Sequence, residues 1–255
     1  MMDQMKHINK LPAITLSFWI MKICATTLGE TAGDLLSMTM KVGYALSSVI
    51  LLCFFFTTLT VQLSTKKFHP IIYWTVILST STAGTTMSDY MDRSLGLGYA
   101  IGSLILVSFL TATLLIWKLT EKSLSVTNIK SFRGEVFYWT AILFSNTLGT
   151  ALGDFLADNS GLGFSGGAIL IGGLLFLIVL VYFFTRVSHV ILFWSAFVLT
   201  RPFGATFGDL LTKTPDKGGL NFGTIGSSFI LFVILVLLVV FSTIKTRKQT
   251  TIRYD

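Results

Sequence analysis

The sequence predicts an all-α polytopic membrane protein with eight transmembrane helices, arranged as four parallel two-helix repeats. Three observations support this fold class. The 255 residues are 53% apolar and only 12% charged, with a mean hydropathy of +0.76, whereas about a quarter of residues are charged in a typical soluble protein. The apolar residues fall into long continuous segments, and the chain repeats one pattern four times.

Eight segments are long enough to cross a hydrocarbon layer of about 30 Å, which takes roughly twenty apolar residues. They are approximately 13–37, 42–63, 70–91, 97–118, 134–157, 163–185, 188–212 and 222–244. Because lipid offers no hydrogen bonds to the backbone, such runs must form helices. A β-barrel is disfavoured because its strands would be segments of about ten residues with alternating polarity.

The repeat is defined by an aromatic-Trp pair that is followed, fifteen residues after the Trp, by an aspartate. The pairs are Trp19/Asp34, Trp74/Asp89, Trp139/Asp154 and Trp194/Asp209. A glycine stands ten residues after each Trp, and a Gly or Ser follows four residues later. This pattern predicts a single membrane domain, 1–255, with repeats at about 12–66, 67–121, 132–186 and 187–244 and a central cytoplasmic linker at 119–132.

The topology follows from two spans per repeat, since all four units then enter the membrane from the same side. The tails and loops on the starting face carry thirteen Lys and Arg residues, and the opposite loops carry four. This asymmetry predicts that both termini are cytoplasmic. The net charge of +7 is therefore attributed to topology, and no nucleic-acid partner is expected.

The first helix of each repeat carries polar residues at positions eight, twelve and fifteen after the Trp, which share one helix face at 100° per residue. The four sets are Thr27-Thr31-Asp34, Thr82-Thr86-Asp89, Thr147-Ala151-Asp154 and Pro202-Thr206-Asp209. The first copy adds Lys22 and Glu30, and the fourth adds Arg201. These extra charges break the fourfold sameness and mark where a ligand would sit.

Structural explanations compete with a functional one for several of these residues. Small residues four apart let transmembrane helices approach closely, which explains the glycines as packing surfaces. Threonines can bond to the carbonyl one turn back. The tryptophans are interpreted as anchors at the headgroup level, where Trp is enriched.

The aspartates are more informative, because they stand late in outward-running helices, where the helix dipole disfavours an anion. Intramembrane acids are costly, so a functional site is the default hypothesis. A boundary error of three residues, about 4.5 Å, would instead put them in the outer headgroup layer. The predicted substrate- or ion-binding residues are Glu30, Asp34, Asp89, Asp154, Asp209, Thr31, Thr86, Thr206, Lys22 and Arg201. Carboxylate and hydroxyl oxygens suit a divalent cation, with Glu30 and Asp34 as metal ligands, or a proton relay.

The run Phe18-Trp19 followed by Thr27-Leu28-Gly29-Glu30-Thr31-Ala32-Gly33-Asp34 resembles a bacterial integral-membrane family built from a fourfold repeat of unknown function, whose members are described as uncharacterised membrane-anchored proteins. The resemblance covers about 11–242. It implies a multi-pass protein of the bacterial cytoplasmic (inner) membrane and leaves the chemistry open.

A membrane transporter or ion carrier is the favoured function, with a divalent metal or a proton as substrate and no resident cofactor. The alternative is a non-transporting scaffold or sensor subunit, whose acids would face neighbouring helices or a partner protein. An enzyme is disfavoured because the predicted core lacks His and reactive Cys residues, so no catalytic residue is assigned. The expected partners are the lipid bilayer and a small ion or small polar molecule, and small-residue faces also allow a homo-oligomer.

Overall fold

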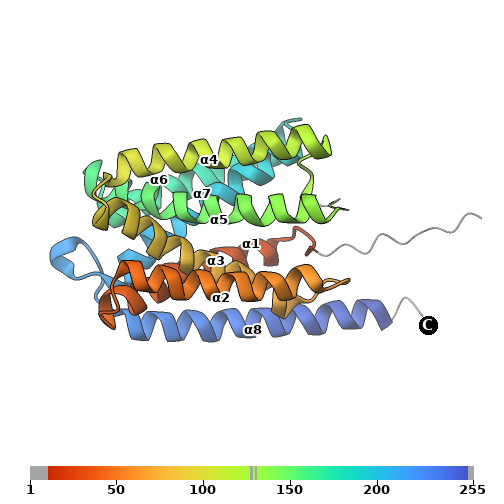
Figure 1. Ribbon diagram of the computed structural model, residues 1–255. Coiled ribbons are helices and arrows are strands. Elements are labelled where there is room, and N and C mark those ends of the chain that lie inside the picture. The colour runs from red at the N-terminus through yellow and green to blue at the C-terminus, as the bar shows by residue number, and fades with distance from the viewer. Residues whose placement is uncertain (1–10, 127–128, 130, 252–255) are drawn as a thin grey trace, which may run out of the picture.

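The computed structural model describes residues 11–126, 129 and 131–251, which are helical apart from turns and short connections (Figure 1). The helices are α1 (Leu16–Asp34), α2 (Tyr44–Ser64), α3 (Pro70–Asp89), α4 (Gly98–Glu121), α5 (Phe132–Asp154), α6 (Gly163–Phe184), α7 (His189–Thr212) and α8 (Thr224–Thr251). Single π-helical turns follow three of them: η1 (Leu35–Thr39) after α1, η2 (Tyr90–Ser94) after α3 and η4 (Phe155–Asn159) after α5. The described residues contain no strand, which confirms the all-α prediction.

The four odd-numbered helices form a closed inner ring. α1 packs against α3 and α7, and α5 packs against the same two helices from the other side. The even-numbered helices lie outside this ring, with α2 on α3, α4 on α5, α6 on α7 and α8 on α1. Each outer helix therefore packs on the inner helix of the next repeat, and the last outer helix closes the circle on the first.

Five helices, α2, α4, α6, α7 and α8, are long and apolar enough to cross a membrane, so this is a membrane protein. The other three, α1, α3 and α5, belong to the inner ring and carry most of the buried polar side chains. Their lower hydropathy has a simple cause. Neighbouring helices surround them, so their polar groups bond to protein and do not face lipid.

The repeated glycines lie where one inner helix meets the next. A Cβ atom added to Gly29 would collide with Ser81, one on Gly84 with Asn146 and Thr147, one on Gly149 with Arg201, and one on Gly204 with Thr26. These contacts run from each repeat to the following one and from the fourth back to the first. The structure thus supports the packing interpretation of these glycines.

Substitution of a ring glycine is expected to be costly. In Gly84→Ala the new Cβ would lie 2.9 Å from the backbone N of Thr147, which cannot move without shifting α5. We expect a loss of about 1–3 kcal/mol in the free energy of unfolding, as for other overpacked cores. The matched control is Gly173→Ala on α6, where nothing lies within 4 Å of the added atom. Equal unfolding curves for the two variants in detergent would contradict this packing account.

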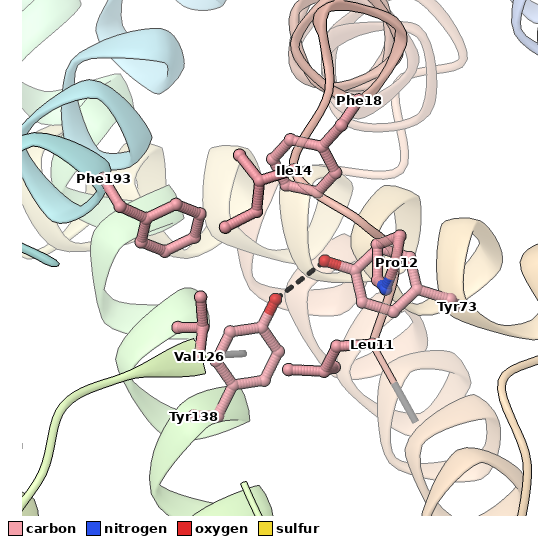
Figure 2. A pocket seen from close by; sticks show the side chains of 8 residues that line it. All are labelled: Leu11, Pro12, Ile14, Phe18, Tyr73, Val126, Tyr138 and Phe193. Carbon is pink, nitrogen blue, oxygen red and sulfur yellow. Dashed lines mark hydrogen bonds between the residues drawn. The ribbon is translucent and has the colours of Figure 1, made fainter. Parts of the chain in front are cut away.

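Three of the four repeat tryptophans pack inside the protein and Trp19 is half-buried, so the structure explains them by packing and does not support a role as lipid-facing anchors. Trp74, Trp139 and Trp194 are buried, with exposed fractions of 2%, 0% and 7%. They form edge-to-face contacts with Tyr73 and Tyr138, whose hydroxyls are 2.7 Å apart (Figure 2). The beginnings of the inner helices enclose a space that these large rings fill, and edge-to-face contacts between the rings stabilise the packing.

Candidate ion-binding site

The inner helices present every fourth residue to the interior of the ring, at positions −1, 3, 7, 11 and 15 relative to the Trp of each repeat. Each position supplies one level of four equivalent residues, all of them buried. From the beginning of the helices to their end, the levels are Phe18/Tyr73/Tyr138/Phe193, Lys22/Ile77/Ile142/Phe197, Thr26/Ser81/Asn146/Arg201, Glu30/Thr85/Thr150/Ala205 and Asp34/Asp89/Asp154/Asp209. The ring therefore encloses a column that is aromatic at one end and acidic at the other.

The level of the four aspartates ends the column, and two basic side chains bridge them in pairs. Arg93 Nε lies 3.0 Å from Asp89 Oδ1, and Arg93 Nη2 lies 3.0 Å from Asp154 Oδ2. Lys213 Nζ lies 2.6 Å from Asp34 Oδ2 and 3.1 Å from Asp209 Oδ1. The four aspartates thus converge in the structure, and their partners Arg93 and Lys213 are two of the four cations in the loops opposite the starting face.

Arg93 and Lys213 occupy the same position in their repeats, four residues after Asp89 and Asp209. The equivalent residues of the first and third repeats are Met38 and Asp158, so only alternate repeats supply a cation. Burial lowers the pKa of Lys213, but the adjacent carboxylates of Asp209 and Asp34 outweigh it and raise the pKa above its ordinary value. The Arg93 side chain is 30% exposed and that of Lys213 16%, so these two cations cover the acids at the surface.

Arg201 extends from its own level to the level of Glu30, directly below the aspartates, and there joins all four repeats. Its Nη1 donates to Glu30 Oε2 of the first repeat at 2.9 Å. Its Nη2 donates to Thr85 Oγ1 of the second at 2.6 Å and to Thr150 Oγ1 of the third at 2.7 Å. Both threonines in turn donate to Glu30 Oε2 at 3.2 Å. The Arg201 side chain is fully buried, so its charge depends on Glu30 for compensation.

The two outer levels hold more negative than positive charge. Glu30 and the four aspartates are five buried carboxylates, and Arg93, Arg201 and Lys213 supply three cations, which leaves two negative charges unmatched when all groups are ionised. Carboxylate oxygens of Glu30, Asp34 and Asp209 lie within 4.8 Å of one another. Such oxygens are suited to holding a hard cation or protons.

The fourfold spacing that defines these levels extends over the whole chain and corresponds to a known family. The Repeat of Unknown Function (DUF347) matches residues 17–68, 72–123, 137–188 and 192–248. The chain belongs to this family. No curated protein and no solved structure matches it.

In this DUF347 protein, the threonines predicted from the repeat make other contacts. Thr31 accepts from Ser228 of α8 and donates to the carbonyl of Leu28. The hydroxyls of Thr86 and Thr206 bond to carbonyls of their own helices. The threonines that contact Glu30 are instead Thr85 and Thr150.

The predicted threonines stand at position twelve after the Trp of the DUF347 repeat, whereas the threonines that contact Glu30 stand at position eleven, one residue earlier. On a straight helix, each residue four positions further along is turned by about 40° relative to the one before it. Such a row can therefore face the axis of the ring along its whole length only when the inner helices cross one another at an angle. The spacing of Glu30 and Asp34, four residues apart, was the signal in the sequence that pointed to this row.

Lys22 lies apart from the acids, on the second level of the column. It is fully buried, and its Nζ donates to Asn146 Oδ1 at 3.3 Å and lies 4.0 Å from the centre of the Phe197 ring. The structure therefore groups Glu30, the Arg201 guanidinium and the four aspartates at one end of the column and leaves Lys22 outside this group.

A further acid, Asp92 of η2, predicts a measurable pH dependence. Its Oδ2 accepts from Ser88 at 3.1 Å, its Oδ1 receives no hydrogen bond, and burial raises its pKa to about 6. The stability that this group contributes is present below about pH 4 and is lost as the pH rises through 6, since the folded state binds the proton more tightly. Asp92→Asn should therefore be more stable than the wild type at pH 8, by on the order of 1 kcal/mol after screening, and not at pH 4. Thermal unfolding at both pH values, with the exposed Asp216→Asn as control, tests this, and a gain that does not depend on pH would refute it.

Proposed function

We propose that this protein is a membrane transporter or ion carrier for a cation, either a divalent metal or one coupled to protons, and that it binds the cation with the carboxylates of the inner helices. The observation that carries the proposal is the excess of negative charge at one end of the buried column, where five carboxylates are grouped with three basic residues. Ionised groups inside a membrane protein are costly unless a partner or a function retains them.

The proposal includes a topology in which all eight helices span the inner membrane of a bacterium and both termini are cytoplasmic. α1, α3 and α5 have 19, 20 and 23 residues, enough for about 30 Å of helix. They lie in one ring with α7, which is itself apolar enough to span. The excess of Lys and Arg on the starting face favours this orientation, in which the acids would lie near the outer surface.

The chemistry of the site favours a cation as the substrate. Glu30, Asp34 and Asp209 offer hard oxygen ligands, and Lys213 already places one positive charge among them. A cation arriving from outside would displace this ammonium and take over its contacts. The column contains no His or Cys side chain, so we propose neither enzymatic activity nor a resident cofactor.

One observation favours a second function, that of a non-transporting scaffold or sensor subunit. Each of the four aspartates already lies within 3.1 Å of Arg93 or Lys213. Such pairs would suffice to fasten the ends of the inner helices together without any ligand.

Ligand-dependent thermal stability distinguishes the two functions. Purified protein is heated with divalent cations, small organic ions and buffers of different pH, beside Glu30→Gln, Asp34→Asn and the surface control Asp216→Asn. If the protein is a carrier, one cation should raise its free energy of unfolding, by about 2.7 kcal/mol when the cation concentration is a hundred times the dissociation constant. This gain should vanish in the first two variants and persist in the control. If no ligand shifts the transition while all variants fold, the scaffold function is favoured.

A further inference from the structure

The environment of Lys22 differs from that of the other three cations of the column. Arg93, Arg201 and Lys213 each contact a carboxylate, whereas the hydrogen-bond acceptor of Lys22 is the amide oxygen of Asn146. That amide is held in place because Asn146 Nδ2 donates to Thr80 Oγ1 at 2.8 Å. An ammonium has three N–H donors and would use one of them here, so two would remain without an acceptor oxygen among the residues that the structure describes.

The charged groups around Lys22 also oppose a positive charge. Arg201 of α7 lies one level away, about 6 Å along the axis, and its guanidinium is fixed by Glu30 and two threonines. The Phe197 ring offers a cation–π contact, but such a contact is weaker than the penalty for burying an unpaired ammonium. A neutral amine would meet neither the repulsion nor the penalty.

Two further titratable groups lie on the other side of Lys22. Tyr73 of α3 and Tyr138 of α5 belong to the next level, on the side away from Arg201, and their hydroxyls are hydrogen-bonded to each other. Both line the small pocket at the beginning of the inner helices (Figure 2). Cys24 of α1 bonds instead to a carbonyl of α8, whose described side chains include no titratable group.

We propose that Lys22 is an uncharged amine in this structure and is the proton-accepting site of the aromatic half of the column. A proton that enters at the tyrosine pair would bond to the nitrogen lone pair and convert the amine to an ammonium. The charged form would repel Arg201 and weaken its hold on Glu30, which links proton uptake at Lys22 to the acidic end. This link rests on the proposed cation-carrier function, whereas the protonation state does not.

The protonation state is tested by unfolding the wild type and Lys22→Met in detergent between pH 6 and pH 9. If the folded amine is neutral, the unfolded chain binds one more proton, so stability rises with pH. The unfolding equilibrium constant of the wild type relative to Lys22→Met should then fall by up to tenfold per pH unit. Parallel curves would overturn the proposal. Lys217→Met, which removes an exposed lysine, should run parallel to the wild type.

A second measurement covers the case in which Lys22→Met does not fold. The side-chain ¹⁵N resonance of Lys22 in the labelled wild-type protein distinguishes an amine from an ammonium, and Lys22→Arg or Lys22→Gln assigns it. An ammonium signal at pH 8 would refute the proposal.

The link to the acids is tested in proteoliposomes with a pH dye inside. Lys22→Met should abolish proton movement driven by a cation gradient while it keeps the thermal shift produced by that cation. Retained proton movement in Lys22→Met would refute the link. If the wild type shows no cation shift at all, the carrier proposal fails, and the pH slope still decides the state of Lys22.

Discussion

Arg201→Met is expected to be among the most damaging substitutions in the protein, with a loss of about 3–5 kcal/mol in the free energy of unfolding. The reason is that it leaves the Glu30 carboxylate, which is 2% exposed, without a cation. It also removes the donor that joins Thr85 and Thr150, so contacts among all four repeats are lost together.

A double-mutant cycle separates these causes. Arg201→Met combined with Glu30→Gln removes both charges, so it should recover most of the loss caused by Arg201→Met alone. Arg186→Met, at an exposed position, serves as control and should be near neutral. Chemical unfolding in detergent measures all of these variants. If the two substitutions change the free energy of unfolding additively, Arg201 and Glu30 are not coupled, and the explanation by an uncompensated carboxylate is wrong.

Lys213→Met should have the largest effect on ligand binding. It removes the ammonium that lies 2.6 Å from Asp34 and 3.1 Å from Asp209, and so leaves two adjacent carboxylates without a local cation. In the absence of ligand we expect a less stable protein, because the carboxylates repel one another. With the cation that the wild type binds, we expect at least about tenfold tighter binding, since the built-in competitor is gone and 1.4 kcal/mol suffices for that factor.

The control for this prediction is Lys217→Met, which removes an exposed lysine from the same loop. Isothermal titration of both variants and the wild type gives the three affinities directly. Weaker binding in Lys213→Met than in the wild type would mean that the lysine helps to hold the ligand, and the displacement mechanism would have to be abandoned.

The sequence predicted the repeat, the all-helical architecture and the equivalence of the four aspartates, because these follow from spacing that is repeated four times. It did not predict the pairing of the aspartates by Arg93 and Lys213. These residues lie just beyond the helices and occur in alternate repeats only, so they look like ordinary loop charges. The position of Thr85 and Thr150 depends on the crossing of the inner helices, which is a property of the assembled ring and not of one segment.

The closed order of the helices also has a consequence for how the protein is made. Glu30 and Asp34 lie in α1, and their partners Arg201 and Lys213 follow 171 and 179 residues later in the chain. During synthesis, these two acids are therefore made well before the cations that compensate their charge. Both cations belong to the fourth repeat, so the ion pairs of the first repeat can form only once the fourth repeat has been made.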